Sequence, residues 1–194
     1  MCGRYTLTSS DQRRLGSRFQ INLDDQLANG MERFNVAPTQ EVLTVQNNPE
    51  AEEGHEAALA RWGLVPFWAK DLKVGYKMIN ARSEGLLKSR AYGPLVKKSS
   101  NRCLILADGF YEWMKAENPK SPKQPVRFTV DGGEPFAFAG LSSCLVLVAI
   151  NSGKGRPRWR VKYRGSWRAA SRKAALRMKS ASRESTLTYL GRHI

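Results

Sequence analysis

The chain has 194 residues, of which 41% are hydrophobic and 25% charged, proportions typical of a folded protein and not of a disordered one. Its longest strongly apolar run, residues 145–150, is much shorter than the roughly 20 residues that a helix needs to cross a bilayer, and the first residues lack the apolar stretch of a secretory signal. The formal net charge is +15, and the three cysteines show no Cys-x-x-Cys spacing, which argues against a disulfide framework or a cysteine-based zinc site. We expect a cytoplasmic protein, associated with the nucleoid in a bacterium or with the nucleus in a eukaryote.

The positive charge is concentrated in the last quarter of the chain. Residues 1–141 hold 19 Lys and Arg against 16 Asp and Glu, whereas residues 142–194 hold 13 Lys and Arg against one acid. We therefore expect an ordinary folded domain over 1–141 and a basic tail over 142–194. A basic tail attracts nucleic acid or anionic surfaces, although a solvated tail that binds polyanions only non-specifically is an equal alternative.

The first elements are a short helix and two strands. The segment Ser9–Asp11 is typical of a helix N-cap, and Leu15 and Phe19 follow at a spacing of four residues, so that both side chains share one helix face. Residues 42–45 and 58–65 have the composition of strands.

An acidic segment, residues 50–56, separates these two strands, and His55 in that segment is expected to be solvated. Residues 102–107 are predicted to form a fully buried strand that ends at the turn signal Asp108-Gly109.

Residues 126–130 alternate in polarity, and residues 135–139 are apolar. Asp131-Gly132-Gly133 between them is a turn signal, so the pattern predicts a β-hairpin. Many short strands and few helical periods indicate an α+β protein with a mainly β core and short helices.

Cys2 is the first residue that could carry chemistry. If Met1 is removed, the chain begins with a free α-amine beside a thiol, and an α-amine has a pKa of about 7.7–8.0. Such an amine condenses with an aldehyde to a Schiff base, which the thiol can close to a five-membered thiazolidine. The alternative is a cysteine that merely follows the initiator methionine.

A second candidate is Glu112 within residues 110–114. In an extended segment Glu112 shares a face with Phe110 and Met114, and a carboxylate among apolar side chains is typical of functional sites. The alternative is an edge-strand glutamate that reaches water or an arginine.

Two further segments favour contacts with nucleic acid. Asn80, Arg82 and Glu84 suit hydrogen bonding to a phosphate or sugar, but they equally suit a helix N-terminus capped by Asn80. Upstream, residues 61–70 place aromatic side chains among basic ones, as in proteins that hold single-stranded DNA. We expect Trp62 to belong to the core, and the aromatic pair that follows, Phe67 and Trp68, to be exposed.

Six segments together resemble the SOS-response-associated peptidase (SRAP) family, the abasic-site DNA–protein crosslinking proteins. The resemblance covers about residues 2–141, and the six motifs occur in the family's order. They are Cys2-Gly3-Arg4-Tyr5, residues 34–40, residues 61–71, residues 78–84, residues 107–113 and Phe138-Ala139-Gly140-Leu141.

The resemblance implies a compact, mainly β fold with a positively charged groove for single-stranded DNA. It implies that Cys2 attacks the ring-opened aldehyde of an abasic sugar and ends as a thiazolidine, that Asn80 orients the Cys2 backbone and amine, and that Glu112 serves the proton transfers. The name "peptidase" then refers to release of the residue before the cysteine, by autolysis or by an aminopeptidase.

The same resemblance implies a DNA contact for four further residues, with Arg4 and Arg82 on the phosphates that flank the lesion and Phe67 and Trp68 wedged against neighbouring bases. It implies a monomer that acts on single-stranded DNA without a cofactor, a metal ion or a membrane.

The chain departs from the family pattern after Leu141. Family members continue to a His-Asp-Arg-Met-Pro-like segment whose histidine acts as an acid or base, whereas here a basic stretch follows and His193 is the only histidine after His55. A shift of reading frame and divergence would each account for the change. Either change would leave the core short of strands and the site without its histidine, so we expect slower crosslinking and an adduct that persists once formed. A non-catalytic basic protein that binds single-stranded nucleic acid and an N-terminal-nucleophile amide hydrolase are the alternative functions.

Overall fold

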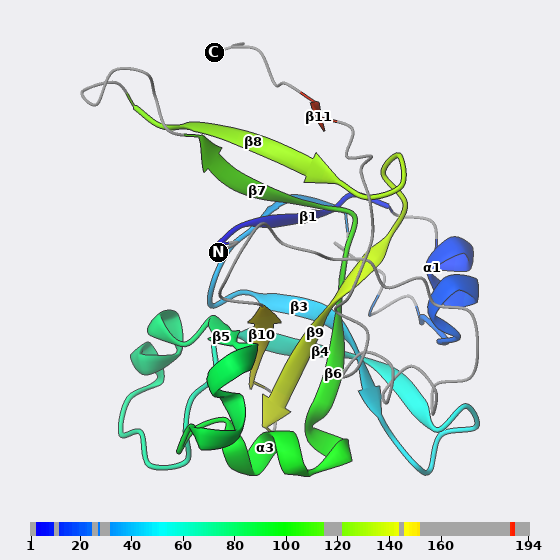
Figure 1. Ribbon diagram of the computed structural model, residues 1–194. Helices are drawn as coiled ribbons and strands as arrows, with labels where there is room; N and C mark the ends of the chain where they lie inside the picture. Colours follow the sequence, from blue (N-terminus) through cyan, green and yellow to red (C-terminus); the bar gives the residue numbers. More distant parts are fainter. Residues whose placement is uncertain are drawn as a thin grey trace.

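The computed structural model describes residues 3–9, 12–24, 27, 32–114, 122–143, 146–151 and 187–188. Two β-sheets pack against each other, with short helices at the periphery (Figure 1), and this confirms the expected mainly β fold. Sheet A has the strand order β11-β8-β7-β1-β2, and sheet B has the order β4-β3-β6-β9-β10-β5. The helical elements are α1 (Gln12–Phe19), η1 (Leu72–Lys77), η2 (Ser83–Lys88), α3 (Gly93–Lys97) and η3 (Ser99–Asn101).

Sheet A is antiparallel throughout its described pairings. Its strands are β1 (Tyr5–Leu7), β2 (Arg33–Val36), β7 (Gly109–Met114), β8 (Gln124–Thr129) and β11 (Leu187–Thr188). Those of sheet B are β3 (Glu41–Asn47), β4 (His55–Trp62), β5 (Asn80–Arg82), β6 (Arg102–Ala107), β9 (Phe136–Ser143) and β10 (Val146–Asn151).

Strand β10 closes sheet B into a ring. One edge of β10 pairs with β9, while its other edge runs parallel first to the end of β4 and then to β5. Because β4 also pairs with β3, which continues through β6 to β9, five strands form a closed circuit and β5 extends it. A closed sheet has no free edge along that circuit.

Aromatic side chains fill the space between the two sheets. Tyr5 of β1 packs edge-on against Trp62 of β4 and Phe138 of β9, with ring centroids 5.3 and 5.9 Å apart. Phe110 of β7 joins the same core cluster. Burial of these large side chains provides much of the free energy that holds sheet A to sheet B. The expected placement of Trp62 in the core is thus confirmed.

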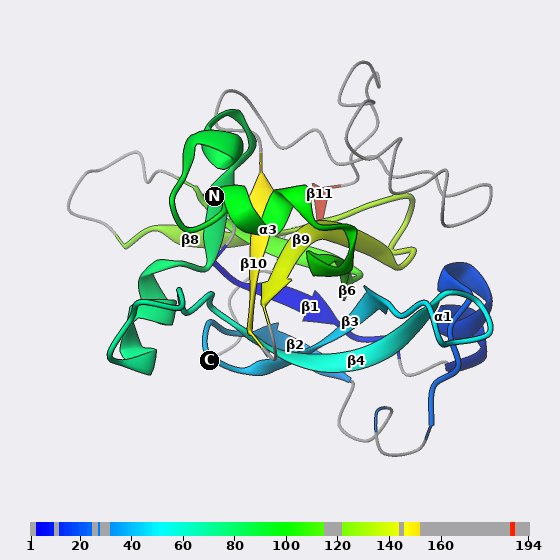
Figure 2. The same ribbon diagram turned by 90° about the horizontal axis from the view of Figure 1, so that it is seen from below.

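The outer face of sheet B carries a second cluster beneath the short helices. Leu86 of η2 packs with Leu141 and Val148 of the sheet, and Leu95 of α3 lies against them. Figure 2 shows α3 lying across β9 and β10 from below. Among the described residues, no helix combines the length and the apolar character that a membrane span requires.

The predicted hairpin over residues 126–139 is wrong, although both of its strands exist. The turn is present, since Asp131, Gly132 and Gly133 all have positive φ, but β8 lies in sheet A and β9 in sheet B. Each strand has its partner elsewhere, because β8 pairs with β7 and β9 pairs with β6. The turn therefore passes the chain from one sheet to the other.

The expectation that His55 is solvated is also wrong. This residue begins β4, and only 4% of its surface is exposed. Its ring nitrogens lie 2.8 Å from the carbonyl oxygen of Glu53 and 3.2 Å from that of Phe19. His55 therefore ties β4 to the end of α1, as a structural residue within the fold.

Other predictions are confirmed. Helix α1 buries Leu15 and Phe19, and β6 coincides with the predicted buried strand.

The break in composition at Leu141 falls inside β9, and β10 adds a further core strand beyond it with Leu147 and Val148 fully buried. The functional division between residues 1–141 and 142–194 stays a prediction.

Candidate active site around the N-terminal strand

The N-terminal strand lies beside Glu112. Strand β1 pairs with β7 in the register Tyr5 to Phe110, and the Tyr111 amide donates to the Arg4 carbonyl at 2.9 Å. This bond holds Arg4 beside Tyr111, which is the neighbour of Glu112 in β7. Glu112 is half-buried in an extended strand, as predicted. Cys2 lies outside the described residues, and its role stays a prediction.

Asn80 is connected to the same strand through Trp62. The indole N–H of Trp62 donates to the carbonyl oxygen of Ile79 at 2.8 Å, while the Trp62 ring packs on Tyr5 of β1. Asn80 is the first residue of β5 and pairs with Ala149 of β10. It is not a helix cap, because the next helix, η2, begins three residues later.

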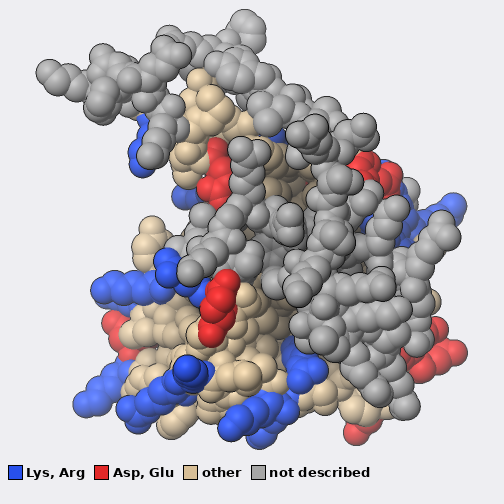
Figure 3. Space-filling view, in the orientation of Figure 1, with Lys and Arg blue, Asp and Glu red and all other residues tan. Residues whose placement is uncertain are grey.

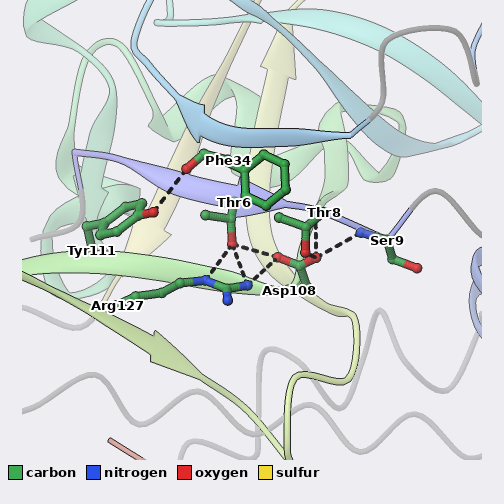
Figure 4. Close-up of polar contacts among 7 residues, drawn as sticks. All are labelled: Thr6, Thr8, Ser9, Phe34, Asp108, Tyr111 and Arg127. Atoms are coloured by element: carbon green, nitrogen blue, oxygen red, sulfur yellow. Dashed lines mark hydrogen bonds and ion pairs between the residues drawn. The ribbon is translucent and has the colours of Figure 1, made fainter. Parts of the chain in front are cut away.

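A buried carboxylate anchors the other end of β1 (Figure 4). Asp108, with 2% of its surface exposed, accepts hydrogen bonds from the Thr6 hydroxyl at 2.6 Å and from the Thr8 hydroxyl at 2.7 Å. The amides of Thr8 and Ser9 also donate to it, and Arg127 of β8 lies 3.2 Å away. Charge-assisted hydrogen bonds of this kind are among the strongest in proteins.

These partners set the ionisation of Asp108. Burial alone would raise its pKa, but the hydrogen bonds from Thr6 and Thr8 and the positive charge of Arg127 lower it more, so the pKa lies below its usual range. Sequence reasoning missed this cluster because Thr6 and Asp108 are 102 positions apart. The available signal was an acidic residue directly after a fully apolar strand.

Polar contacts also join β2 to the start of β1 and to β7. Arg4 donates from Nη1 to Oδ1 of Asn35 at 3.1 Å, and the Tyr111 hydroxyl donates to the Phe34 carbonyl at 3.1 Å (Figure 4). Arg4 is half-buried. These contacts hold three strands of sheet A together at the edge where the chain begins.

The aromatic pair proposed to contact DNA is exposed, as predicted. Phe67 exposes 86% of its surface and Trp68 exposes 38%, and the two rings meet edge-on at 4.7 Å. The guanidinium of Arg90 lies 4.7 Å from the centroid of the Trp68 ring, within the range of cation–π attraction. Arg82 is likewise exposed, at the end of β5. Contact of any of these residues with DNA stays a prediction.

Basic side chains gather on the same side of the molecule. Figure 3 shows Lys and Arg crowding the lower left face, over the region where η1, η2 and α3 lie in Figure 1. Residues 70–102 hold nine Lys and Arg and two acids, and eight of the nine are exposed. Such a surface attracts polyanions.

Cys103, the cysteine that the described residues include, is a core residue. Cys103 of β6 is buried, and this burial raises the pKa of its thiol to about 12 despite a hydrogen bond with Ser142 that lowers it. A thiol of this kind is inert at neutral pH, because the thiolate is the reactive form. Within the described residues, no cluster of His, Cys, Asp and Glu could hold a metal ion.

The fold and the site together define a class of protein. Its features are two packed β-sheets, an N-terminal strand beside a glutamate, and a face with basic and aromatic side chains. Comparisons with known proteins identify this class. The family model "SOS response associated peptidase (SRAP)" matches residues 1–157. The chain therefore belongs to the SRAP family.

Named relatives agree with this membership, and a solved structure shares the fold. The chain is 44% identical over 144 residues to the abasic site processing protein YoqW of Bacillus subtilis, covering 73% of this chain and 59% of the relative. It is 47% identical over 66 residues to the abasic site processing protein HMCES of Gallus gallus, covering 32% of this chain and 19% of the relative. A solved structure from Bacteroides thetaiotaomicron superposes with a TM-score of 0.69 at 15% identity, over 92% of this chain and 83% of that one. The chain thus spans about three fifths of the length of the Bacillus relatives it matches.

Proposed function

We propose that this protein processes abasic sites in single-stranded DNA by forming a covalent crosslink through Cys2, after an aminopeptidase or autolysis has removed Met1. The observation that carries the proposal is the register of β1 against β7, which holds Arg4, two residues after Cys2, beside Tyr111, the neighbour of Glu112. The relatives YoqW and HMCES are named abasic site processing proteins, which supports abasic-site processing as the activity.

The chemistry requires only groups that the chain and the lesion supply. Removal of Met1 hydrolyses one peptide bond and frees the α-amine of Cys2. The amine adds to the C1′ aldehyde of the ring-opened sugar, and loss of one water gives a Schiff base. The Cys2 thiol then adds across the C=N bond, so that a C–S bond forms and the thiol proton passes to the nitrogen, which closes the thiazolidine.

In this proposal the residues around β1 position and protonate the reacting groups. Glu112 exchanges protons with the sugar hydroxyl during ring opening, and Asn80 orients the Cys2 backbone and amine. Arg4 and Arg82 contact the phosphates on either side of the lesion. The exposed Phe67–Trp68 pair stacks on neighbouring bases, as aromatic side chains do in other proteins that bind single strands.

An intact mass measurement tests the proposal. The purified protein is incubated with single-stranded DNA that carries one abasic site, and the expected product has the mass of Met1-free protein plus DNA less one water. Cys2→Ala and a variant with a retained N-terminal extension are expected to give no adduct, because each lacks the free aminothiol. An equal adduct yield from the extended variant would exclude the mechanism.

The same experiment separates the alternative functions. Binding that weakens with salt and leaves no adduct would favour a non-catalytic basic nucleic-acid-binding protein, whose electrostatic affinity depends steeply on ionic strength. Hydrolysis of amide substrates by the mature N-terminus, without any DNA adduct, would favour an N-terminal-nucleophile hydrolase.

A further inference from the structure

Residues 64–78 form a surface loop that follows β4 and contains η1. The loop extends from the left side of the molecule in Figure 1. The Leu64 amide donates to the Met78 carbonyl at 3.1 Å, which joins the two ends of the loop. The backbones of Gly63 and Gly75 also touch, since a Cβ on Gly75 would lie 2.7 Å from the Gly63 carbonyl oxygen. These contacts at its base fix the position of the loop on the body of the protein.

The side chains of η1 point away from this base. Leu72 and Tyr76 expose 62% and 65% of their surface, and Val74 is also exposed, whereas Gly75 is the one buried residue of the helix. Exposed apolar side chains in one cluster mark an interaction site more often than isolated ones do. The loop also carries three exposed lysines, Lys70, Lys73 and Lys77.

The charge of the loop identifies the class of partner. Asp71 is its only acid, and its carboxylate is already engaged as the N-cap of η1, accepting from the Lys73 amide at 2.8 Å. Three lysines interspersed with an aromatic and two aliphatic side chains combine charge for a phosphate backbone with apolar surface for bases. That combination is the one by which proteins hold single strands.

We propose that η1, the part of this loop that follows the aromatic pair Phe67 and Trp68, is a second contact for single-stranded DNA beyond that pair. Bases that extend past this pair stack on Tyr76 and pack against Leu72, while Lys73 and Lys77 contact phosphates. The proposal rests on the proposed function, because it takes the same strand as its ligand. It adds that affinity depends on DNA length as well as on the lesion.

The test uses unmodified single-stranded DNA, so that binding is measured without crosslinking. Fluorescence anisotropy of a short and a long oligonucleotide is compared for the wild-type chain, Tyr76→Ala and Tyr76→Phe. We expect Tyr76→Ala to lower affinity for the long strand by about 5- to 150-fold, as for the loss of one stacked base, and to change affinity for the short strand less. Tyr76→Phe, which keeps the ring, is expected to bind as the wild type does.

Matched variants control for the loss of apolar surface and of charge. Leu87→Ala removes an equally exposed apolar side chain from η2 and is expected to leave affinity unchanged. Lys73→Ala with Lys77→Ala is compared with Arg13→Ala with Lys123→Ala, which removes the same charge at two exposed positions outside the basic surface of residues 70–102. Only the first pair is expected to reduce the slope of log K against log salt, by about 1.4 for two phosphate contacts.

Each result decides between the two proposals. If the wild type binds no single-stranded DNA, both the proposed function and the loop contact are wrong. If the wild type binds but Tyr76→Ala and the Lys73–Lys77 double variant bind the long strand equally well, the loop contact alone is overturned. Unchanged circular dichroism and melting temperature confirm that the variants are folded.

Discussion

The indole N–H of Trp62 donates to the carbonyl oxygen of Ile79 at 2.8 Å, directly before Asn80 in the chain. The same indole packs against Tyr5 of the N-terminal strand. One buried side chain thus connects two segments of the proposed site that are 75 positions apart in the sequence. Their relative position depends on the aromatic core between the sheets.

The first prediction concerns this bond. Trp62→Phe keeps a ring against Tyr5 but removes the donor to Ile79 and some core volume, so we expect the free energy of unfolding to fall by about 2 kcal/mol. Urea denaturation measures the loss. Trp68→Phe, the same change at an exposed position, is the control and is expected to cost less than about 0.5 kcal/mol. Equal losses in the two variants would contradict the assigned role of Trp62.

The second prediction concerns Asp108 and pH. Because hydrogen bonds and Arg127 lower its pKa in the folded protein, ionised Asp108 contributes stability that is fully present above the ordinary carboxyl value of 3.8. That stability is lost as the pH falls from this value through the lower native pKa. We expect Asp108→Asn to lower the free energy of unfolding at pH 7 by about 3 kcal/mol and to flatten its decline in acid.

Urea denaturation between neutral and acidic pH measures both effects. Asp71→Asn is the matched control, because an asparagine can still accept the Lys73 amide at this exposed N-cap. We expect its stability to follow that of the wild type at every pH. A parallel acid decline in Asp108→Asn and the wild type would mean that other carboxylates cause the decline.

The third prediction tests Glu112 as a proton-transfer group. Positioned acids and bases typically contribute about 100- to 10,000-fold to a rate, so Glu112→Gln is expected to slow adduct formation by a factor in that range. Binding of unmodified DNA is expected to be unchanged. Rates are read from denaturing gels of time courses at saturating abasic DNA. Glu52→Gln, at an exposed glutamate between β3 and β4, should react at the wild-type rate.

The fourth prediction concerns the close approach of Gly63 and Gly75. A methyl group on Gly75 would lie 2.7 Å from backbone oxygen, so Gly75→Ala forces the loop at residues 64–78 to shift. We expect a loss of about 1–3 kcal/mol and weaker binding of long single-stranded DNA. Gly85→Ala, where a Cβ would meet nothing within 4 Å, is expected to be neutral in both thermal melting and DNA binding.

The fifth prediction follows from the departure of the sequence after Leu141. Opening the thiazolidine requires a proton at the site, and the residues that follow Leu141 do not show the His-Asp-Arg-Met-Pro-like segment that the family resemblance led us to expect. We therefore expect an adduct that forms slowly and persists. The adduct is formed on one oligonucleotide and challenged with excess competitor abasic DNA. Exchange as fast as in a relative that has the histidine would show that another residue supplies the proton.

Local sequence patterns correctly predicted one helix, one strand and the exposure of one aromatic pair. The spacing of Leu15 and Phe19 predicted α1, and the apolar run at 102–107 predicted β6. The exposure of Phe67 and Trp68 was also predicted, because a proline and lysines surround them. Each of these features depends on side chains within a few positions of one another.

Features that depend on distant partners were not predicted. The turn at 131–133 resembles that of a hairpin, but β8 and β9 find their partners in β7 and β6, so the strands separate. His55 looked solvated in its acidic context, yet the carbonyl of Phe19 lies against its ring. The apolar run at 145–150 was assigned to the basic tail that follows Leu141, yet it forms β10 of the core. Tertiary pairing decided all three cases.

The closure of sheet B by β10 has a consequence for protein synthesis. Until residues 146–151 leave the ribosome, β9 and the ends of β4 and β5 have no partner along the edges that β10 covers, and unpaired edges favour aggregation. The N-terminal cysteine is made first, but the strand that positions Asn80 is made after most of the domain. A nascent chain would therefore present its thiol and amine to the cell well before the surroundings that give them selectivity exist.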